Sequence, residues 1–416
     1  MPNDRYDVVV VGGGLAGSSL SIALARHGAS VLMLEAEVRF RDRVRGEVLM
    51  PWGVAEARSL GIYDVLVEAG ARPLPYRDTY VGGELRSRRP FARESENGES
   101  PLAFQHASVQ EALLRAAAEA GARVLRGARV RQLSSGCDPR VTFEIDGRVE
   151  TASGGLVAGA DGRASRILSL GGFEVSRGAR GLMTAGVALS NVDVTQDAVA
   201  VAYDLRQGVS AALLPQGSGR ARAYLTNSPG RPGQAAVQNL PRLIERLVAA
   251  GLPAAAFASA SAAGPLATFD GTPKWVETPY RDGVVLIGDA ASTSDPAWGQ
   301  GMSLALRDVS VLTDAFTVSG DAAQAGYRYA AEHARYGATS RVVSRLVSLA
   351  QFGANSEARL LRSSPFWKAS ARRIKAMLLD GPDGGLGDLL LSGLPAGEIA
   401  AATPAQNPVT VPASTC

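Results

Sequence analysis

The stretch from Tyr6 to Glu35, YDVVVVGGGLAGSSLSIALARHGASVLMLE, decides the fold of the first part of the chain. Val8 to Val11 form a continuous β-branched run without alternation, which is typical of a parallel strand covered on both faces. A glycine turn follows, then a helix predicted over Ser18 to His27 and a second apolar strand over Val31 to Leu34. This order predicts a dinucleotide-binding βαβ unit.

The turn of this unit carries three glycines at G-x-G-x-x-G spacing: Gly12, Gly14 and Gly17. The first allows a tight turn, the second lets the backbone approach a pyrophosphate, and the third lets helix and strand pack closely. Leu15 and Ala16 complete the predicted cofactor-binding turn, where a helix N-terminus presents free N–H groups to phosphate. Glu35 ends the second strand and is placed to accept hydrogen bonds from a ribose diol, so an unphosphorylated ribose is favoured.

Length and composition exclude several classes of protein. A chain of 416 residues is longer than a single hydrophobic core usually supports, so at least two domains are expected. The net charge of +3 is too small to indicate a nucleic-acid partner, and no apolar run reaches membrane-spanning length. Two cysteines, Cys137 and Cys416, cannot make a disulfide framework. We therefore expect reduced thiols and a cytoplasmic location. We also expect a monomer or homodimer with no integral membrane association and no metal site.

The pattern of strands and turns indicates a second, inserted domain. Short apolar strands recur between residues 182 and 226 with Gly and Pro between them, which favours an antiparallel sheet. We predict an α/β fold with a discontinuous nucleotide-binding domain at residues 1–75, 102–170 and 280–320. The remaining parts are a β-rich substrate domain at 76–101 and 171–279, a C-terminal helical region at 321–399 and a disordered tail at 400–416.

Local signals predict further elements inside these domains. Apolar spacing favours a single helix over residues 51–66, and residues 124–130 are expected to form one strand. Ser108 precedes an amphipathic run over residues 109–120 with Glu111 three positions later, which predicts a capping box.

Three segments in this order resemble the single-component (group A) FAD-dependent aromatic hydroxylases of the para-hydroxybenzoate hydroxylase type. They are GGGLAG with Glu35, GADGRASR at residues 159–166, and GVVLIGDAASTSDPAWGQGMSLALRD at 283–308. The resemblance implies a Rossmann-like FAD-binding domain, an inserted antiparallel β-sheet substrate domain and C-terminal helices. It implies FAD as cofactor, transient NADH or NADPH, and O2, which would hydroxylate an aromatic or polycyclic small molecule through a flavin C4a-hydroperoxide.

The resemblance also assigns residues to the cofactor. Asp161 is expected where FAD and the nicotinamide cofactor meet, and a family arginine near the FAD phosphates matches Arg45. The ribityl or ribose hydroxyls and the pyrimidine edge of the flavin are assigned to Gly288, Asp289, Gly299, Gly301 and Met302. Gln105 or His106 stands where the family often has arginine, although a lone histidine is more often a packed structural residue. Ser292 replaces a frequent histidine, so covalent flavin attachment is not indicated.

On the substrate side, the resemblance places Pro296 in the loop facing the reactive edge of the flavin, with Trp298 beside it. Tyr203, Arg222 and Tyr224 lie on strands of the inserted sheet and are further candidates for substrate contact. Ordinary sheet packing is the alternative role for these side chains. Pocket-lining residues in this family come from the variable insertion, so the substrate does not follow from the sequence.

Other functions on the same scaffold remain open. Epoxidation and Baeyer–Villiger insertion would need the same cofactor site. GEVLMP at residues 46–51 faintly resembles the GESLLP of flavin-dependent halogenases, but no lysine precedes Lys274 and their W-x-W-x-I-P signature is missing. Prenyl-chain reductases share the fold, but their cysteine-rich features are missing here, and a non-catalytic flavin-binding protein is the last alternative. The basic C-terminal helices could also lie on an anionic membrane, although packing on the catalytic domain is favoured.

Overall fold

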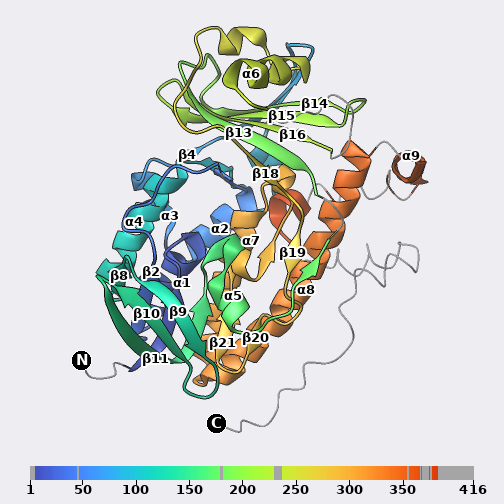
Figure 1. Cartoon of the computed structure of the whole chain (residues 1–416). Coiled ribbons are helices and arrows are strands. Elements are labelled where there is room, and N and C mark those ends of the chain that lie inside the picture. The colour runs from blue at the N-terminus through green and yellow to red at the C-terminus, as the bar shows by residue number, and fades with distance from the viewer. Residues whose placement is uncertain are drawn as a thin grey trace.

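The structure is a computed structural model that describes residues 5–44, 46–178, 181–228, 237–353 and 356–365, together with Trp367, Ile374 and residues 377–382. Two large sheets dominate it, one below the other in Figure 1. We call the lower one the nucleotide sheet and the other the upper sheet. Arg45 and the predicted tail at 400–416 lie outside the described residues.

The nucleotide sheet runs in the order β20-β21-β11-β1-β2-β8, with β10 paired to β11 and β9 to β10. Its strands are β1 (Arg5–Val11), β2 (Val31–Glu35), β8 (Arg123–Arg126), β9 (Arg129–Ser134), β10 (Arg140–Ile145), β11 (Arg148–Gly159), β20 (Tyr280–Arg281) and β21 (Val284–Leu286). Strand β1 lies parallel between β2 and β11, and Val10 is opposite Met33 and Ala158. Val8 to Val11 of β1 are buried on both faces of the sheet, which explains their unbroken apolar run.

Helices cover one face of the nucleotide sheet. Val8 and Val10 pack in one cluster with Leu20 of α1 (Leu15–Arg26), Leu113 of α4 (His106–Glu119) and Leu306 of α7 (Gly301–Ser319). On the opposite face Val9 and Val11 pack with residues of β9 and β10 and with Ile167 of α5 (Arg166–Leu170). The glycine turn after β1 therefore lies at the carboxyl edge of a sheet that is covered on both sides, where α/β folds place their ligands.

The upper sheet runs in the order β17-β13-β16-β15-β14-β5-β6, with β18 paired to β13. Its strands are β5 (Tyr76–Val81), β6 (Glu84–Pro90), β13 (Met183–Ser190), β14 (Ala198–Asp204), β15 (Val209–Gly217), β16 (Arg220–Asn227), β17 (Ser261–Ala262) and β18 (Ala267–Asp270). All its pairs are antiparallel except β14 with β5. Helix α6 (Leu240–Ala249) covers the outer face, where its Leu243 and Leu247 pack on Val187 and Leu225. The other face, which we call the inner face, turns toward the nucleotide sheet (Figure 1).

Two small three-stranded sheets lie between the large ones. One consists of β3 (Val48–Leu49), β7 (Leu102–Ala103) and β4 (Arg72–Pro73), and the other of β12 (Ser176–Arg177), β19 (Lys274–Trp275) and β22 (Ser292–Thr293). An apolar cluster joins the first of these sheets to the inner face of the upper sheet. Its buried members are Leu74, Phe91, Ala103, Val199, Val201, Leu214 and Leu379, with Val48, Met50, Ala212 and Tyr224 partly buried against them. We call it the interdomain cluster.

Three local predictions were wrong. The single helix over residues 51–66 is two helices, α2 (Pro51–Ser59) and α3 (Tyr63–Glu68), because Gly61 between them has φ +66°. The strand over residues 124–130 is likewise divided into β8 and β9, and Gly127 between them has φ +74°. Ser108 does not cap a helix: α4 begins two residues earlier, at His106. Glu111 instead accepts two hydrogen bonds from Arg126, at 2.6 and 3.0 Å.

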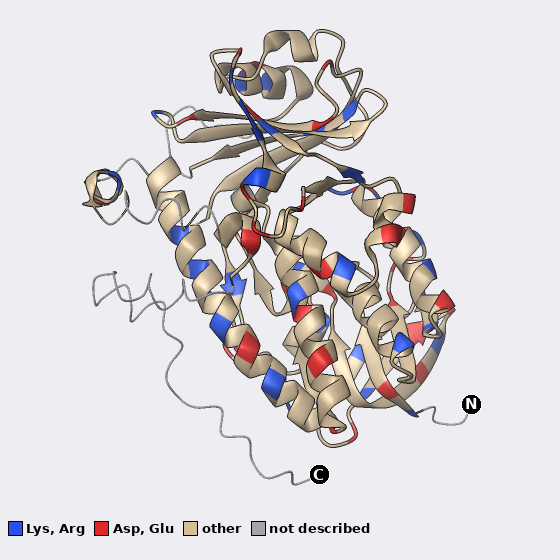
Figure 2. Ribbon diagram, turned by 180° about the vertical axis from the view of Figure 1, so that it is seen from behind, with Lys and Arg blue, Asp and Glu red and all other residues tan. Residues whose placement is uncertain are grey.

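The C-terminal region runs alongside both large sheets (Figure 1). Helix α8 (Ala322–Phe352) runs from the foot of the nucleotide sheet toward the upper sheet, and α9 (Ser356–Ser363) follows it. Acidic and basic residues are interspersed along α7 and α8 (Figure 2). Among the described residues, no helix is both long and apolar enough to cross a membrane. Phe366, Lys368, Arg372, Arg373 and Lys375, on which the idea of a basic membrane-surface helix partly depends, lie outside the described residues.

Candidate functional site

The glycine turn after β1 shows why each of its glycines is needed. Gly12 has φ +106°, and a Cβ there would lie 2.5 Å from the Ala160 carbonyl oxygen. A Cβ on Gly17 would overlap the Gly12 carbonyl oxygen. By contrast, a Cβ on Gly14 would have one neighbour within 4 Å, Gln110 Nε2 at 3.7 Å. Gly12 and Gly17 therefore serve packing, whereas Gly14 keeps a space open at the N-terminus of α1.

The N-terminus of α1 is suited to an anion. Gly14 is its N-cap residue, so no side chain caps the first turn. Leu15 and Ala16 are buried, and their backbone N–H groups lie in that first turn. Uncapped N–H groups and the positive end of the helix dipole together favour phosphate.

Glu35 is fixed beside this turn at the end of β2. Its side chain accepts hydrogen bonds from the backbone N–H of Gly13 at 2.6 Å and of Glu37 at 2.7 Å. The residue is 7% exposed, so the carboxylate is both oriented and nearly buried. Each carboxylate oxygen can accept a further hydrogen bond, which is what a ribose diol would supply.

The loop after β21 approaches the same turn. Gly288 has φ +60°, and a Cβ there would lie 3.2 Å from Cβ of Ala16. The side chain of Asp289 is 43% exposed and lies 3.6 Å from Arg163 Nε. A half-exposed carboxylate at this edge of the sheet can accept hydrogen bonds from ligand hydroxyl groups.

Asp308 holds this loop from helix α7. Its Oδ2 accepts a hydrogen bond from the Gly288 backbone N–H at 2.6 Å, and the side chain is 3% exposed. Its Oδ1 accepts from the Tyr336 hydroxyl and lies 3.1 Å from His333 Nδ1. Tyr329, one turn before His333 on α8, donates to the Leu286 carbonyl at 2.8 Å. Sequence analysis missed this buried network, which joins α7 and α8 to the loop.

Asp161 caps a helix in this structure. Its Oδ2 accepts hydrogen bonds from the N–H groups of Arg166 and Ile167 at 2.6 and 3.2 Å, and its Oδ1 accepts from the Ser165 hydroxyl at 2.5 Å. Gly162 follows it with φ +76°. These bonds fix the strand-to-helix turn at the start of α5, next to Ala160 and the glycine turn.

The segment before α7 forms a second glycine loop. Gly299 has φ +64°, and a Cβ there would meet Met50 Sδ and Val48 Cγ1, each at 3.5 Å. Gln300, 5% exposed, is the N-cap residue, and its side chain does not cap the helix. It instead accepts from Trp52 Nε1 at 2.8 Å and donates to the carbonyls of Trp298 and Leu378 at 2.8 and 3.2 Å. The N–H groups at Gly301 and Met302 lie in the first turn, without a side-chain cap.

The start of α4 brings Gln105 and His106 to the boundary between the domains. Gln105 is the N-cap residue of α4, and the His106 N–H lies 3.2 Å from Glu47 Oε1. The His106 ring stacks on Phe104 with centroids 6.5 Å apart. Arg45 is not among the described residues, so its place relative to this site is left open.

Arg222 is a buried cation that pairs with a buried carboxylate. It is 1% exposed and projects from β16 onto Glu47, which is fully buried. Arg222 Nε and Nη2 contact the two Glu47 oxygens at 2.6 and 2.8 Å, and Nη2 also contacts Asp42 Oδ1 at 2.6 Å. Burial lowers the pKa of Arg222, but the hydrogen bond and negative charge of Glu47 outweigh it and raise the pKa above its ordinary value. Glu47, inside GEVLMP, is a site residue that sequence analysis did not select.

The four other predicted substrate-side residues fall in different surroundings. Tyr224 joins the interdomain cluster, and Tyr203, on β14, is 40% exposed. Pro296 lies beside Gly271, whose Cβ would be 2.6 Å from Pro296 Cδ. Trp298 donates to Ser348 Oγ at 3.1 Å and packs edge-on against Phe352, so its indole contacts α8. The structure thus brings Tyr224 and Arg222 together on one face and places Trp298 against the C-terminal helix.

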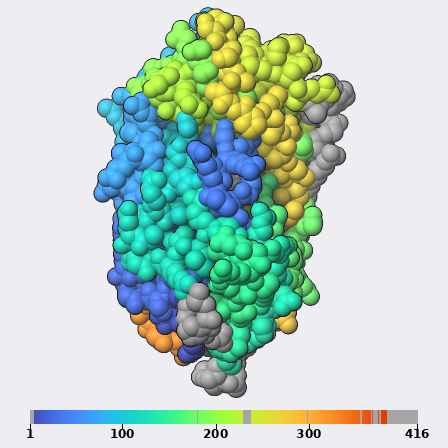
Figure 3. Space-filling view, turned by 60° about the vertical axis from the view of Figure 1, so that its left-hand side comes forward, coloured from blue at the N-terminus to red at the C-terminus, as the bar shows by residue number. Residues whose placement is uncertain are grey.

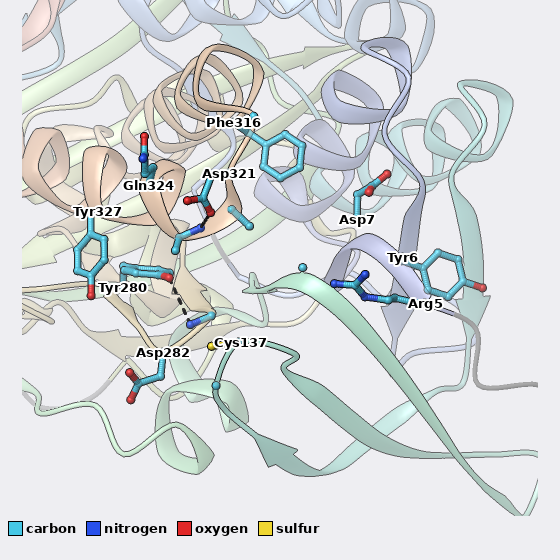
Figure 4. Close-up of a pocket in the computed structure, with 16 residues that line it drawn as sticks. Arg5, Tyr6, Asp7, Cys137, Tyr280, Asp282, Phe316, Asp321, Gln324 and Tyr327 are labelled. Carbon is cyan, nitrogen blue, oxygen red and sulfur yellow. Dashed lines mark hydrogen bonds between the residues drawn. The ribbon is translucent and has the colours of Figure 1, made fainter. Parts of the chain in front are cut away.

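A cavity of about 640 Å³ lies elsewhere, at the amino edge of the nucleotide sheet (Figure 4). Arg5, Asp7, Tyr280 and Asp321 are among its lining residues, whereas the glycine turn follows the other end of β1. It is therefore distinct from the predicted cofactor site. Cys137, which also lines it, is disulfide-bonded, contrary to the expected reduced thiol; Cys416 lies outside the described residues.

These features fit FAD. The open space at Gly14 and the uncapped start of α1 suit a pyrophosphate. The buried Glu35 and the half-exposed Asp289 suit sugar hydroxyls. The second glycine loop contacts Val48 and Met50 of the interdomain cluster. No group of His, Cys, Asp and Glu that could hold a metal occurs among the residues that the structure describes. The fold and site define a flavoprotein with a Rossmann-like domain.

Comparison with known proteins agrees with this class. Residues 5–350 match a family described as "FAD binding domain". A digeranylgeranylglycerophospholipid reductase of Methanopyrus kandleri is 30% identical over 319 residues, 73% of this chain and 74% of that protein. The ubiquinone hydroxylase UbiL of Rhodospirillum rubrum is 27% identical over 74% of this chain and 71% of its own length. A squalene epoxidase of Aspergillus fumigatus is 40% identical over 81 residues, which are 20% of this chain and 16% of that protein.

Solved structures show the same fold. PqsL of Pseudomonas aeruginosa, described as a probable FAD-dependent monooxygenase, has a TM-score of 0.72 at 20% identity, over 87% of this chain and 100% of its own. Aklavinone-11 hydroxylase with FAD and aklavinone has a TM-score of 0.68 at 18% identity, over 92% of this chain and 72% of that one. The chain belongs to the family described as "FAD binding domain". It is an oxidoreductase with FAD as cofactor.

Proposed function

We propose that this protein uses NAD(P)H and O2 to hydroxylate an aromatic or polycyclic small molecule. One observation carries the proposal: the second glycine loop, which leads into α7, contacts residues of the apolar interdomain cluster. Val48 and Met50 contact the position of Gly299 on one side and belong to the cluster on the other. An apolar substrate in this region would be next to the cofactor-facing end of α7.

The protein's own residues would bind, orient and shield. The chemistry that FAD supplies when bound is hydride acceptance and activation of O2. The first turn of α1 would hold the pyrophosphate, and Glu35 and Asp289 the hydroxyl groups of the cofactor. The first N–H groups of α7, at Gly301 and Met302, would stabilise negative charge on the flavin through hydrogen bonds and the helix dipole. The interdomain cluster would keep water away from the reacting atoms.

Isotope labelling of the product tests this proposal. The purified protein is expected to contain FAD, to oxidise NAD(P)H faster with substrate, and to transfer one oxygen atom from labelled O2. A panel of phenols and fused aromatic ketones, analysed by mass, would provide substrates. Oxidation of NAD(P)H that never places labelled oxygen in any product would contradict hydroxylation.

Prenyl-chain reduction is the second candidate. It is favoured by the 30% identity to an archaeal digeranylgeranylglycerophospholipid reductase over nearly three quarters of both chains. The same mass analysis separates the two reactions, because a reductase adds two hydrogens per double bond and incorporates no labelled oxygen. Epoxidation of an alkene would add one oxygen without a new hydroxyl group, which chemical derivatisation distinguishes.

We also propose that the protein acts as a monomer or homodimer without a nucleic-acid partner. The net charge of +3 gives no basic surplus for a polyanion. Sedimentation equilibrium of the FAD-loaded protein, with and without duplex DNA, would check both statements.

A further inference from the structure

The inner face of the upper sheet is mostly apolar where it approaches the second glycine loop. Val199, Val201 and Leu214 contribute its buried side chains to the interdomain cluster. Leu379 reaches the same cluster from the C-terminal segment, whose neighbouring Leu378 carbonyl accepts a hydrogen bond from Gln300. In the space-filling view, dark-blue residues of the N-terminal part border a hollow between the two domains (Figure 3). A substrate entering here would meet aliphatic and aromatic side chains.

The charge on this face is already compensated. Arg222 is the buried cation of β16, and the carboxylates of Glu47 and Asp42 both contact it at 2.6 Å. Glu47 is fully buried, whereas the Asp42 side chain is 37% exposed. Two carboxylates thus face one guanidinium. A substrate carboxylate brought to Arg222 would add a third negative charge in a region with little water, where like charges repel strongly.

One donor of Arg222 has no partner. Nη1 is buried and makes no hydrogen bond to any residue that the structure describes, while Nε and Nη2 are engaged. Leaving a buried donor unsatisfied costs about 1–3 kcal/mol, and more when the group is charged. A carbonyl or hydroxyl oxygen could accept this hydrogen bond without bringing a charge. The arrangement therefore suits an acceptor that is polar but neutral.

Tyr224 reinforces this preference two residues further along β16. Burial first, and then the negative charge of Glu47, raise the pKa of its phenol well above the ordinary value. The side chain therefore remains protonated and neutral at physiological pH, and it lines the interdomain cluster without adding a charge. The inner face thus combines apolar walls, a neutral phenol and a guanidinium neutralised by carboxylates.

We propose that the substrate is an uncharged, largely apolar molecule with one oxygen acceptor that binds Arg222 Nη1. Glu47 and Asp42 select against a substrate carboxylate, and the interdomain cluster contacts the carbon skeleton. This inference rests on the proposed oxygenase function, because it assumes that the substrate occupies the space between the second glycine loop and the upper sheet.

A matched pair of probes tests the inference on the FAD-loaded enzyme. Methyl hydroxynaphthoate and the free hydroxynaphthoate share one ring system and differ in charge at neutral pH. Titration is followed through the visible absorbance of bound FAD, which reports binding without turnover. The ester is expected to bind at least about ten-fold more tightly than the acid, a difference of about 1.4 kcal/mol. Equal or tighter binding of the acid, or no binding of either probe to protein that retains FAD, overturns the inference.

Two variants sharpen the test. Glu47→Gln removes one carboxylate and is expected to shrink the preference for the ester severalfold. Glu245→Gln makes the same change on α6, over the outer face of the sheet, where Glu245 pairs with Arg242 in solvent. It is expected to leave the preference unchanged. If Glu47→Gln does not fold, the comparison of ester and acid binding on the unmodified enzyme still tests the inference. A purified protein that does not bind FAD would instead overturn the proposed function itself.

Discussion

The carboxylate of Asp308 accepts a hydrogen bond from the backbone N–H of Gly288 at 2.6 Å, across twenty residues of chain. Helix α7 therefore fixes the backbone of the loop that carries Asp289. Because Tyr336 and His333 of α8 contact the other oxygen of Asp308, the C-terminal helix also contributes to the position of this loop.

Asp308→Asn should weaken FAD binding. An amide has one acceptor oxygen, so it cannot accept hydrogen bonds both from the Gly288 N–H and from the Tyr336 hydroxyl as the carboxylate does. We expect the FAD dissociation constant to rise by about ten-fold or more, since a hydrogen bond to a charged group contributes about 1.5–3 kcal/mol. Flavin fluorescence titration of the apoprotein measures it. Asp314→Asn, at an exposed position of the same helix, is the control. Equal affinities for both variants would contradict the assigned role.

Gly17→Ala and Gly14→Ala should separate packing from cofactor binding. The new Cβ at position 17 would overlap the Gly12 carbonyl, so we expect the apoprotein to lose about 1–3 kcal/mol of unfolding free energy. At position 14 the nearest atom would be 3.7 Å away, so the apoprotein should keep its stability. FAD affinity should nevertheless fall, because the methyl group occupies the space for the pyrophosphate. Urea unfolding and FAD titration distinguish the two, and a stable apoprotein with alanine at 17 would refute the packing role.

Ser165→Ala should cost far more stability than Ser108→Ala. Ser165 caps α5 by accepting a hydrogen bond from Leu168 N–H at 2.9 Å, whereas Ser108 lies within α4 and caps nothing. Loss of a hydroxyl cap costs about 0.5–2 kcal/mol. Thermal unfolding of the two variants should therefore differ clearly in midpoint. Similar midpoints would restore the capping role that the local sequence predicts for Ser108.

Acid sensitivity should depend on Glu111. The hydrogen bonds of Arg126 lower its pKa, burial opposes them, and the Phe40 N–H lowers it further. A lowered pKa stabilises the folded state above the unfolded value of about 4.3, and this contribution is lost as pH falls through the folded pKa. Glu111→Gln should therefore show a smaller loss of stability than the unmodified protein on acidification. Urea midpoints across this range measure the difference, and parallel pH profiles would argue against the contribution of this pair.

The sequence alone determined the parts of the fold that local pattern encodes. The apolar run of β1, the glycine spacing and Glu35 predicted the βαβ unit, because backbone geometry and burial on both faces restrict which residues fit there. Strands β13 to β16 of the upper sheet also follow from short apolar runs with turn residues between them. Ser108 shows the limit: a local capping signal gave way to the Glu111 to Arg126 ion pair.

The tertiary structure alone decided which distant side chains meet. Arg222 was a candidate for substrate contact by its place on a strand, but its pairing with Glu47 joins residues 175 positions apart. Asp308 and His333 meet because α7 and α8 pack together, which no local period reports. Contacts of this kind form only when the domains dock and exclude water, and docking then fixes the partner of each buried charge. The sequence therefore predicts the cofactor-binding turn, and the packing of the upper sheet against the N-terminal part decides that Arg222 pairs with Glu47.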